Sequence, residues 1–263
     1  MTITRSSAQH RATYPDLAGG VAVITGGSRG IGAATARALV ANGAAVALIA
    51  RHPEPLAAQV ELIAADGGRA LAITADCTAA EQMQQAARTV AEQLGPVDVL
   101  ATFAGGQGEP VATVKETEAH WQRVLETNLT ATFLTVQAFL PAMVQRGRGA
   151  IITMSSSAAR QVERTSAAYA AAKAGVSALT RQLASENAGH GIRVNCLAPA
   201  STLNDRMQAH MSEQQLGQLA AGFPLGRIAM PQDIAEAALF LASDASSWIT
   251  GVTLDITGGR IMR

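Results

Sequence analysis

The chain has 263 residues, enough to bury a substantial core as one large domain, and its 20 basic and 20 acidic residues cancel to a net charge of zero. This balance, without any basic run, excludes the electrostatic footprint of a nucleic-acid-binding protein. The sequence also lacks a secretory signal, an apolar run long enough to cross a bilayer, and cysteines at disulfide or metal-ligand spacing. We therefore expect a cytoplasmic protein without membrane segment, disulfide or metal.

From about residue 19 onward, short apolar runs alternate with longer helical segments. The runs lack strict apolar/polar alternation, which is typical of strands covered by helices on both faces. Expected strands lie at 21–25, 44–50, 69–74, 97–103, 149–155, 192–198 and 252–256, and expected helices at 31–42, 56–65, 79–94, 116–146, 166–188 and 232–242. This order predicts a doubly wound α/β (Rossmann) fold: a seven-stranded parallel sheet with helices on both faces. It forms a single domain over residues 19–263, after a polar extension over 1–18.

The first strand ends in a glycine-rich turn, "TGGSRGIG", at residues 25–32, which opens a helix. Backbone N–H groups and the positive end of that helix could approach a pyrophosphate there without interference from Cβ atoms. The glycines at 26, 30 and 32 do not follow the G-x-G-x-x-G spacing, so the turn alone is also compatible with a tight turn that binds no ligand.

The segment "YAAAK", residues 169–173, places one of only two tyrosines four residues before one of only two lysines. On a helix this spacing brings both side chains to one face. A nearby ammonium favours the phenolate, and so would bring a tyrosine that ordinarily titrates at about 10 closer to neutral pH. The alternative is a lysine that snorkels beside a half-buried tyrosine.

Taken together, "TGGSRGIG", "SSS" at 155–157, "YAAAK" and the closing "ITGVTLDITGG" at 249–259 resemble the short-chain dehydrogenase/reductase family, from about residue 19 to the C-terminus. The resemblance implies a catalytic set of Asn128, Ser156, Tyr169 and Lys173. Tyr169 would exchange the proton, Ser156 would hold the substrate oxygen, and Lys173 would lower the pKa of Tyr169 and bind the nicotinamide ribose. Asn128 would hold a water in a locally distorted helix. Alternatively, Asn128 is an exposed polar residue and Ser156 a strand-end cap.

The cofactor is predicted from the end of the second strand. Ala50 stands where NAD-selective members carry an acid, and Arg51 follows it. Together with Arg29 this favours the 2′-phosphate of NADP(H) over NAD(H), although both arginines could simply be solvated. Asp76 matches the family's adenine contact or begins the next helix. The predicted nucleotide-binding residues are Gly26, Ser28, Arg29, Gly30, Ile31, Gly32, Arg51, Asp76, Cys77, Ala104, Gly105, Tyr169, Lys173, Pro199 and Thr202.

Two segments depart from the family pattern. "TFAG" at 102–105 replaces an Asn-Asn-Ala-Gly run, so packing beside the central strands must differ, and Ala200 follows Pro199 where the family often has glycine. Residues 200–229 correspond to the family's substrate lid, and their apolar side chains favour core packing over a ligand wall. The charged residues Arg160, Glu163 and Arg164 could contact a polar substrate or a neighbouring subunit, with solvated loop charges as the default.

The function predicted from these residues is an NADP(H)-dependent oxidoreductase that interconverts a small-molecule carbonyl and a secondary alcohol. Two alternatives stay open: a nucleotide-using epimerase or dehydratase of the same fold, and a nucleotide-binding sensor or scaffold without turnover. The resemblance also implies a homo-oligomer, a tetramer or dimer, formed through residues 166–188 and the closing strand.

Overall fold

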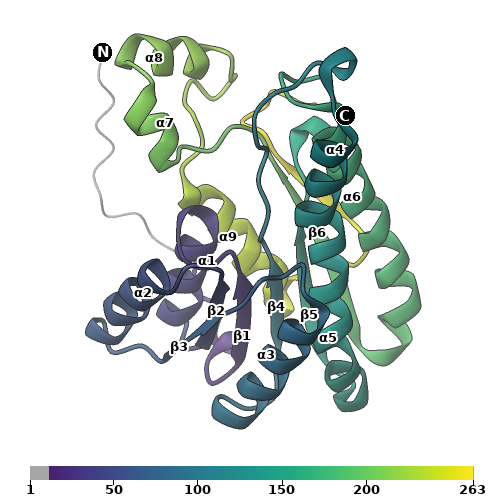
Figure 1. The fold of residues 1–263 in the computed structure, drawn as a ribbon. Helices are drawn as coiled ribbons and strands as arrows, with labels where there is room; N and C mark the ends of the chain where they lie inside the picture. Colours follow the sequence, from purple (N-terminus) through teal and green to yellow (C-terminus); the bar gives the residue numbers. More distant parts are fainter. Residues whose placement is uncertain (1–11, 263) are drawn as a thin grey trace.

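The sheet organises the whole molecule. The computed structural model describes residues 12–262, and within them seven parallel strands form one sheet in the order β3-β2-β1-β4-β5-β6-β7 (Figure 1). The strands are β1 Val21–Thr25, β2 Ala45–Ala50, β3 Ala70–Thr74, β4 Val99–Thr102, β5 Gly149–Met154, β6 Ile192–Pro199 and β7 Thr253–Ile256. The predicted fold class and all seven predicted strands are confirmed. Because β1 pairs with β2 on one side and β4 on the other, the winding reverses there and opens a crevice at the strands' carboxyl ends.

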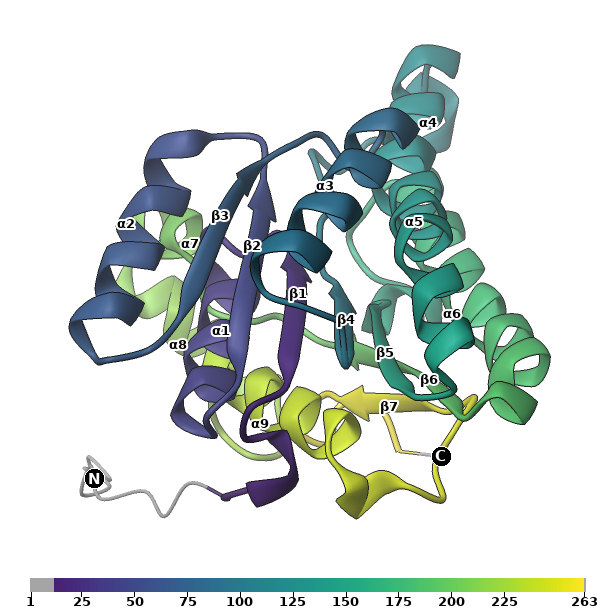
Figure 2. The ribbon, with the colours of Figure 1, turned by 90° about the horizontal axis from the view of Figure 1, so that it is seen from below.

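Helices cover both faces of the sheet (Figure 2). One face carries α1 Gly30–Ala41, α2 Pro53–Ala65 and α9 Pro231–Ala242, and the other carries α3 Ala80–Gln93, α4 Glu118–Leu125, α5 Ala131–Arg146 and α6 Ala167–Asn187. Successive residues of β1 serve the two layers in turn: Ala22 and Ile24 pack in the cluster with α1 and α9, and Val21 and Val23 in the cluster with α3 and α5. Both layers are apolar, which explains the unbroken apolar runs in the sequence.

The helix predicted over 116–146 is interrupted. A π-helical turn, Glu126–Thr130, separates α4 from α5 and contains Asn128. Two side chains in this turn bond to the preceding helical turn: Thr127 Oγ1 donates to the Arg123 carbonyl at 2.8 Å, and Asn128 Nδ2 donates to the Val124 carbonyl at 3.0 Å. Such side chains compete for backbone acceptors, which favours a local bulge. The predicted distortion at Asn128 is confirmed.

Residues 200–229, the predicted substrate lid, contain two short helices that are absent from the predicted elements, α7 Asp205–His210 and α8 Glu213–Ala221. They stand above α1 and α9 (Figure 1). Asn204 caps α7 through the Met207 N–H, and Ser212 forms a capping box with Gln215 at α8. Of the apolar lid side chains expected to pack in the core, only Phe223 is buried; Leu225 is 71% exposed, so that expectation is wrong for most of the set.

The predicted N-terminal extension is described only from residue 12; residues 1–11 lie outside the described part of the chain. Its described end packs on the fold. A single 3-10 turn, Pro15–Leu17, buries Leu17, and the Asp16 carboxylate accepts a hydrogen bond from the Asp244 N–H at 2.8 Å. Between residues 12 and 262, we find no helix that combines the length and hydrophobicity required to cross a membrane.

Candidate active site

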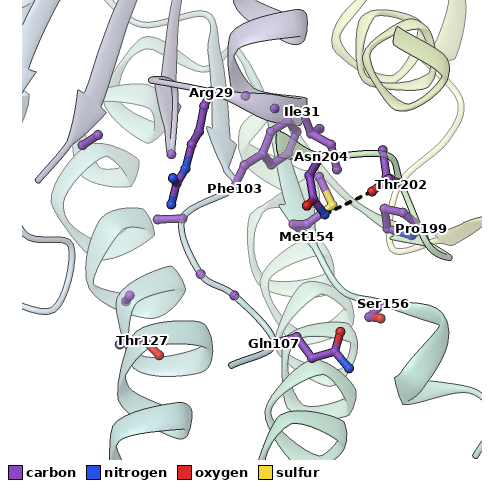
Figure 3. Close-up of a pocket in the computed structure, with 18 of the residues that line it drawn as sticks. Arg29, Ile31, Phe103, Gln107, Thr127, Met154, Ser156, Pro199, Thr202 and Asn204 are labelled. Carbon is purple, nitrogen blue, oxygen red and sulfur yellow. Dashed lines mark hydrogen bonds between the residues drawn. The ribbon is translucent and has the colours of Figure 1, made fainter. Parts of the chain in front are cut away.

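A cleft of about 660 Å³ opens at the carboxyl ends of the strands, on both sides of the β1/β4 seam (Figure 3). Its walls come from the turn after β1, the segments after β2, β3 and β4, the end of β5, the first turns of α6, and the chain after β6. Every residue predicted to bind the nucleotide lines this cleft, as do Ser156, Tyr169 and Lys173. Asn128 does not line it. The structure therefore brings together residues that lie up to 176 positions apart, from Gly26 to Thr202.

The glycine turn between β1 and α1 packs tightly and leaves open space beside its backbone. A Cβ at Gly32 would lie 2.3 Å from the Gly26 carbonyl oxygen, so only glycine lets helix and strand approach this closely. Gly30 has a φ of +55° and also lines the cleft, and a Cβ there would meet no atom within 4 Å, because it would enter open space. Helix N–H groups bordered by such a space fit the pyrophosphate of a dinucleotide.

Charged side chains line the cleft after β1, β2 and β3. Arg29 and Arg51 both line it with exposed side chains, and in Figure 3 Arg29 extends into the cleft. The Asp76 carboxylate accepts hydrogen bonds from the Thr78 N–H at 2.9 Å and the Thr78 hydroxyl at 2.8 Å. The backbone bond in particular lowers the pKa of Asp76, and the charge of Arg51 acts in the same direction. Asp76 thus both lines the cleft and shapes the turn that leads into α3.

The neighbouring Cys77 is inert. Burial raises the pKa of its thiol to about 11, so the thiolate is scarce at neutral pH. Cys77 and Cys196 are both free and buried, and we find no cluster of three or more His, Cys, Asp or Glu side chains suited to a metal ion among residues 12–262.

The altered "TFAG" segment contacts the end of β1 and Asn128. The Ala104 N–H donates to Thr25 Oγ1 at 3.1 Å, whereas the buried Thr102 hydroxyl has no hydrogen-bond partner among the described residues. A Cβ at Gly105 would lie 2.7 Å from Asn128 Oδ1, so this close approach requires glycine. After β6, Ala200 adopts no positive φ, and the chain turns through a bond from Thr202 Oγ1 to the Ala200 carbonyl at 3.2 Å.

Asn128 lies beneath the cleft and is fully buried, so the exposed alternative is wrong. Its side-chain amide brackets Gly106: Oδ1 accepts from the Gly106 N–H at 3.1 Å, and Nδ2 donates to the Gly106 carbonyl at 3.1 Å. The residue thereby fixes the loop after β4 to the π-helical turn. Its predicted role in holding a water stays a prediction.

Lys173 and Tyr169 share one face of α6, as their spacing predicts. The Lys173 Nζ atom lies 5.6 Å from the centroid of the Tyr169 ring and donates a hydrogen bond to the Met154 carbonyl at 2.9 Å. Lys173 is only 4% exposed, so it does not snorkel to solvent. Burial lowers the pKa of Lys173 to about 8.

Tyr169 and Ser156 face the cleft from α6 and from the segment after β5. Burial raises the pKa of Tyr169 above its ordinary value, the Ser156 hydroxyl opposes that shift, and the negative charge of Glu163 adds to it. The predicted net lowering of this pKa by Lys173 is therefore wrong for the protein by itself, because the desolvation of the phenolate dominates. Ser156 Oγ also accepts from the Ala158 N–H at 3.2 Å, so it caps a 3-10 turn as well as lining the cleft.

Sequence reasoning missed several contacts around these residues. The Met154 carbonyl, which binds Lys173, carries no side-chain signal. Gln107 lines the cleft and donates from Nε2 to the Arg164 carbonyl at 2.9 Å, joining two loops. Of the three charged residues between Ser156 and Tyr169, only Glu163 lines the cleft; Arg160 instead pairs with Asp255 of β7 at 3.2 Å.

Comparison with known proteins finds relatives over most of the chain. The family model described as "Enoyl-(Acyl carrier protein) reductase" matches residues 26–260. The chain is 39% identical over 242 residues to a cis-4-hydroxycyclohexanecarboxylate dehydrogenase of Sinomonas cyclohexanicum, covering 91% of this chain and 95% of that protein. It is 40% identical over 256 residues to a galactitol 2-dehydrogenase (L-tagatose-forming) of Cereibacter sphaeroides, covering 92% and 95%.

Solved structures also match the chain over its whole length. A 3-oxoacyl-[acyl-carrier protein] reductase from Brucella melitensis with bound NAD superimposes with a TM-score of 0.89 at 30% identity, covering 100% of this chain and 99% of that one. The family model and the relatives match nearly the whole length of the chain, and the solved structure has the same fold. The chain is an oxidoreductase of the short-chain dehydrogenase/reductase family, whose members use a nicotinamide cofactor.

Proposed function

We propose that the protein is an NADP(H)-dependent oxidoreductase that interconverts a small-molecule carbonyl and a secondary alcohol, with Tyr169 as the general acid and base. The observation that carries this proposal is the convergence of Ser156, Tyr169 and Lys173 in the cleft that also contains the glycine turn after β1. A nucleotide seated on that turn would share the cleft with the tyrosine hydroxyl.

The roles of the side chains follow from their surroundings. A bound nicotinamide supplies or accepts the hydride. Tyr169, whose raised pKa keeps it protonated at neutral pH, donates the proton to the carbonyl oxygen during reduction. The Ser156 hydroxyl orients that oxygen and stabilises its developing charge. Lys173 remains mostly protonated at neutral pH and holds its ammonium against the Met154 carbonyl beside the tyrosine ring.

Steady-state assays test the proposal directly. With a panel of ketones, the protein should oxidise NADPH continuously, because each turnover consumes one hydride equivalent. An epimerase would use no net cofactor, and a sensor or scaffold would bind the nucleotide without turnover. Either of those results would contradict the proposed reaction.

The proposed preference for NADP(H) rests on Arg51 and Arg29, which line the cleft. Ala50, also in the lining, stands where NAD-selective members carry an acid. Replacing Arg51 with Ala should weaken NADPH binding about tenfold, because a charge-assisted bond to the 2′-phosphate contributes about 1.5 kcal/mol or more. NADH, which lacks that phosphate, should lose much less affinity. Titration of both nucleotides, followed by fluorescence, measures the difference.

The matched control is Arg88→Ala, which removes the same charge from α3, where Arg88 bonds to Gln85 and does not line the cleft. It should leave both affinities unchanged. Equal losses of NADPH and NADH affinity in the Arg51 variant would rule out the contact with the 2′-phosphate.

A further inference from the structure

Two loops enclose the end of the cleft that contains Ser156 and Tyr169. The first follows β4 (residues 103–117), and the second joins β5 to α6 (residues 155–166). Gln107 of the first loop donates its side-chain hydrogen bond to the Arg164 carbonyl of the second, which fixes the two walls together. In Figure 3, Gln107 and Ser156 lie in the part of the cleft away from Arg29, one of the two arginines on which the proposed NADP(H) preference rests.

Glu163 brings a carboxylate to this enclosed end. Among the described residues that line the cleft, only Asp76 and Glu163 are acidic, and Asp76 stands beside Arg51 with its carboxylate bonded to Thr78. Glu163 is half-buried, and Gln161 Nε2 donates to its Oε1 at 3.1 Å, which holds the carboxylate in place. Arg160, in the same loop, donates to the Asp255 carboxylate at 3.2 Å and to the Thr253 carbonyl at 3.1 Å.

The Glu163 carboxylate influences Tyr169, the proposed general acid and base. Glu163 lines the same cleft as Ser156 and Tyr169, and its negative charge adds to the burial that raises the pKa of Tyr169. An ionised carboxylate only accepts hydrogen bonds, and in a half-buried site it repels a second anion more strongly than it would in water. It therefore favours substrates that present hydroxyl donors near the reacting carbon, and it disfavours those with a carboxylate or phosphate there.

We propose that Glu163 determines the substrate class: its carboxylate binds a hydroxyl group adjacent to the reacting carbon, so the enzyme prefers neutral polyols and hydroxyketones to anionic hydroxy acids. This inference rests on the proposed function. Glu163 selects the substrate, and the proton transfer itself stays with Tyr169.

Glu163→Gln tests the proposal, because it keeps the size of the side chain and removes the charge. We compare kcat/KM for oxidation of a four-carbon polyol, of 2-butanol and of 3-hydroxybutyrate with NADP⁺. In the variant, the ratio of polyol to 2-butanol should fall about tenfold, as expected for loss of a charged hydrogen-bond acceptor. The ratio of 3-hydroxybutyrate to 2-butanol should rise. The control Glu118→Gln, on an exposed carboxylate of α4, should change neither ratio.

The pH profile supplies a readout that a merely structural role would not move. Tyr169 experiences the negative charge of Glu163, and Lys173 lies beside its ring on the same helix. Lys173 in turn interacts with Cys196 of β6. Removing the negative charge lowers the pKa of Tyr169, so the acid limb of the oxidation profile should move to lower pH in Glu163→Gln.

Unchanged ratios, or an equal loss with all three substrates, would overturn the inference, as would a wild-type preference for 2-butanol over the polyol. Wild-type turnover of any of these alcohols with NADP⁺ supports the proposed function independently of these ratios. If the wild-type protein oxidised none of them and reduced no ketone, the proposed function would fail, and the inference would fail with it.

Discussion

Replacement of Tyr169 by Phe should lower kcat/KM for ketone reduction about 10³-fold, the scale expected when a general acid is removed. The phenylalanine ring can keep the position of the tyrosine ring, 5.6 Å from Lys173 Nζ, but it has no proton to donate to the carbonyl oxygen. Since neither the glycine turn nor the two cleft arginines changes, nucleotide affinity should stay within about threefold of wild type, well below 1 kcal/mol on the binding scale. Initial rates and a nucleotide titration on the same preparation check both statements.

The chain supplies its own control for this experiment. Tyr14 is the only other tyrosine, and it lies outside the cleft, where its N–H donates to Asn42 Oδ1. Tyr14→Phe should retain wild-type rates. If Tyr169→Phe kept activity within a few-fold of wild type, the general acid would have to be another group.

Lys173→Met should change the pH dependence of stability. The pKa of Lys173 falls from 10.5 to about 8 on folding. Below pH 8, Lys173 is protonated in both the folded and the unfolded state, and the desolvation of its buried ammonium lowers the free energy of unfolding. Between 8 and 10.5 the unfolded state binds more protons, so the free energy of unfolding of the wild type rises with pH through this group. Relative to the methionine variant, the wild type should gain about 3 kcal/mol across that window.

Urea denaturation of both proteins without nucleotide, at pH 7 and at pH 10.5, measures this gain as a difference that cancels the titration of other groups. The control is Lys115→Met, at the only other lysine, which is exposed in a 3-10 turn before α4. Its difference from wild type should stay flat with pH. A flat difference for Lys173→Met as well would mean that Lys173 keeps its ordinary pKa in the folded protein.

The central strands could be predicted because they are apolar runs buried between two helix layers, whereas the edge strands β3 and β7 are partly exposed. The ends of the strands and helices follow less directly from the sequence. The second helix begins at Pro53 and not at Leu56, because proline fits the first turn, where its missing N–H has no helical acceptor. In the predicted lid, Asn204 and Ser212 are residue types that commonly cap helix N-termini, and they indicate where α7 and α8 begin. The prediction for this segment used only its apolar side chains, which favoured core packing.

The sequence indicated which residues gather at the candidate site, but it did not indicate which hydrogen bonds they make. The side chains carried over by the family resemblance gather in one cleft, except for Asn128 just beneath it. Yet Lys173 bonds to the backbone of Met154, and Asn128 bonds to the backbone of Gly106 and Val124, and the side chains of these partners carry no signal of the contact. The direction of the Tyr169 pKa shift also depends on how deeply the phenol is buried, and a four-residue spacing does not contain that information.

The pairing of β1 with β4 also limits how much of the sheet can form while the chain is being synthesised. Its register pairs Ala22 with Val99, 77 positions later, so β1 keeps one open edge until residues 99–102 have left the ribosome. The unit made first, β1 to β3, can already bury one side of its sheet, but its exposed edge is a template for pairing with other nascent chains. Because the cleft straddles the β1/β4 seam and also needs α6 and the chain after β6, no ribosome-bound fragment that ends before about residue 202 contains all the residues proposed to bind nucleotide and substrate.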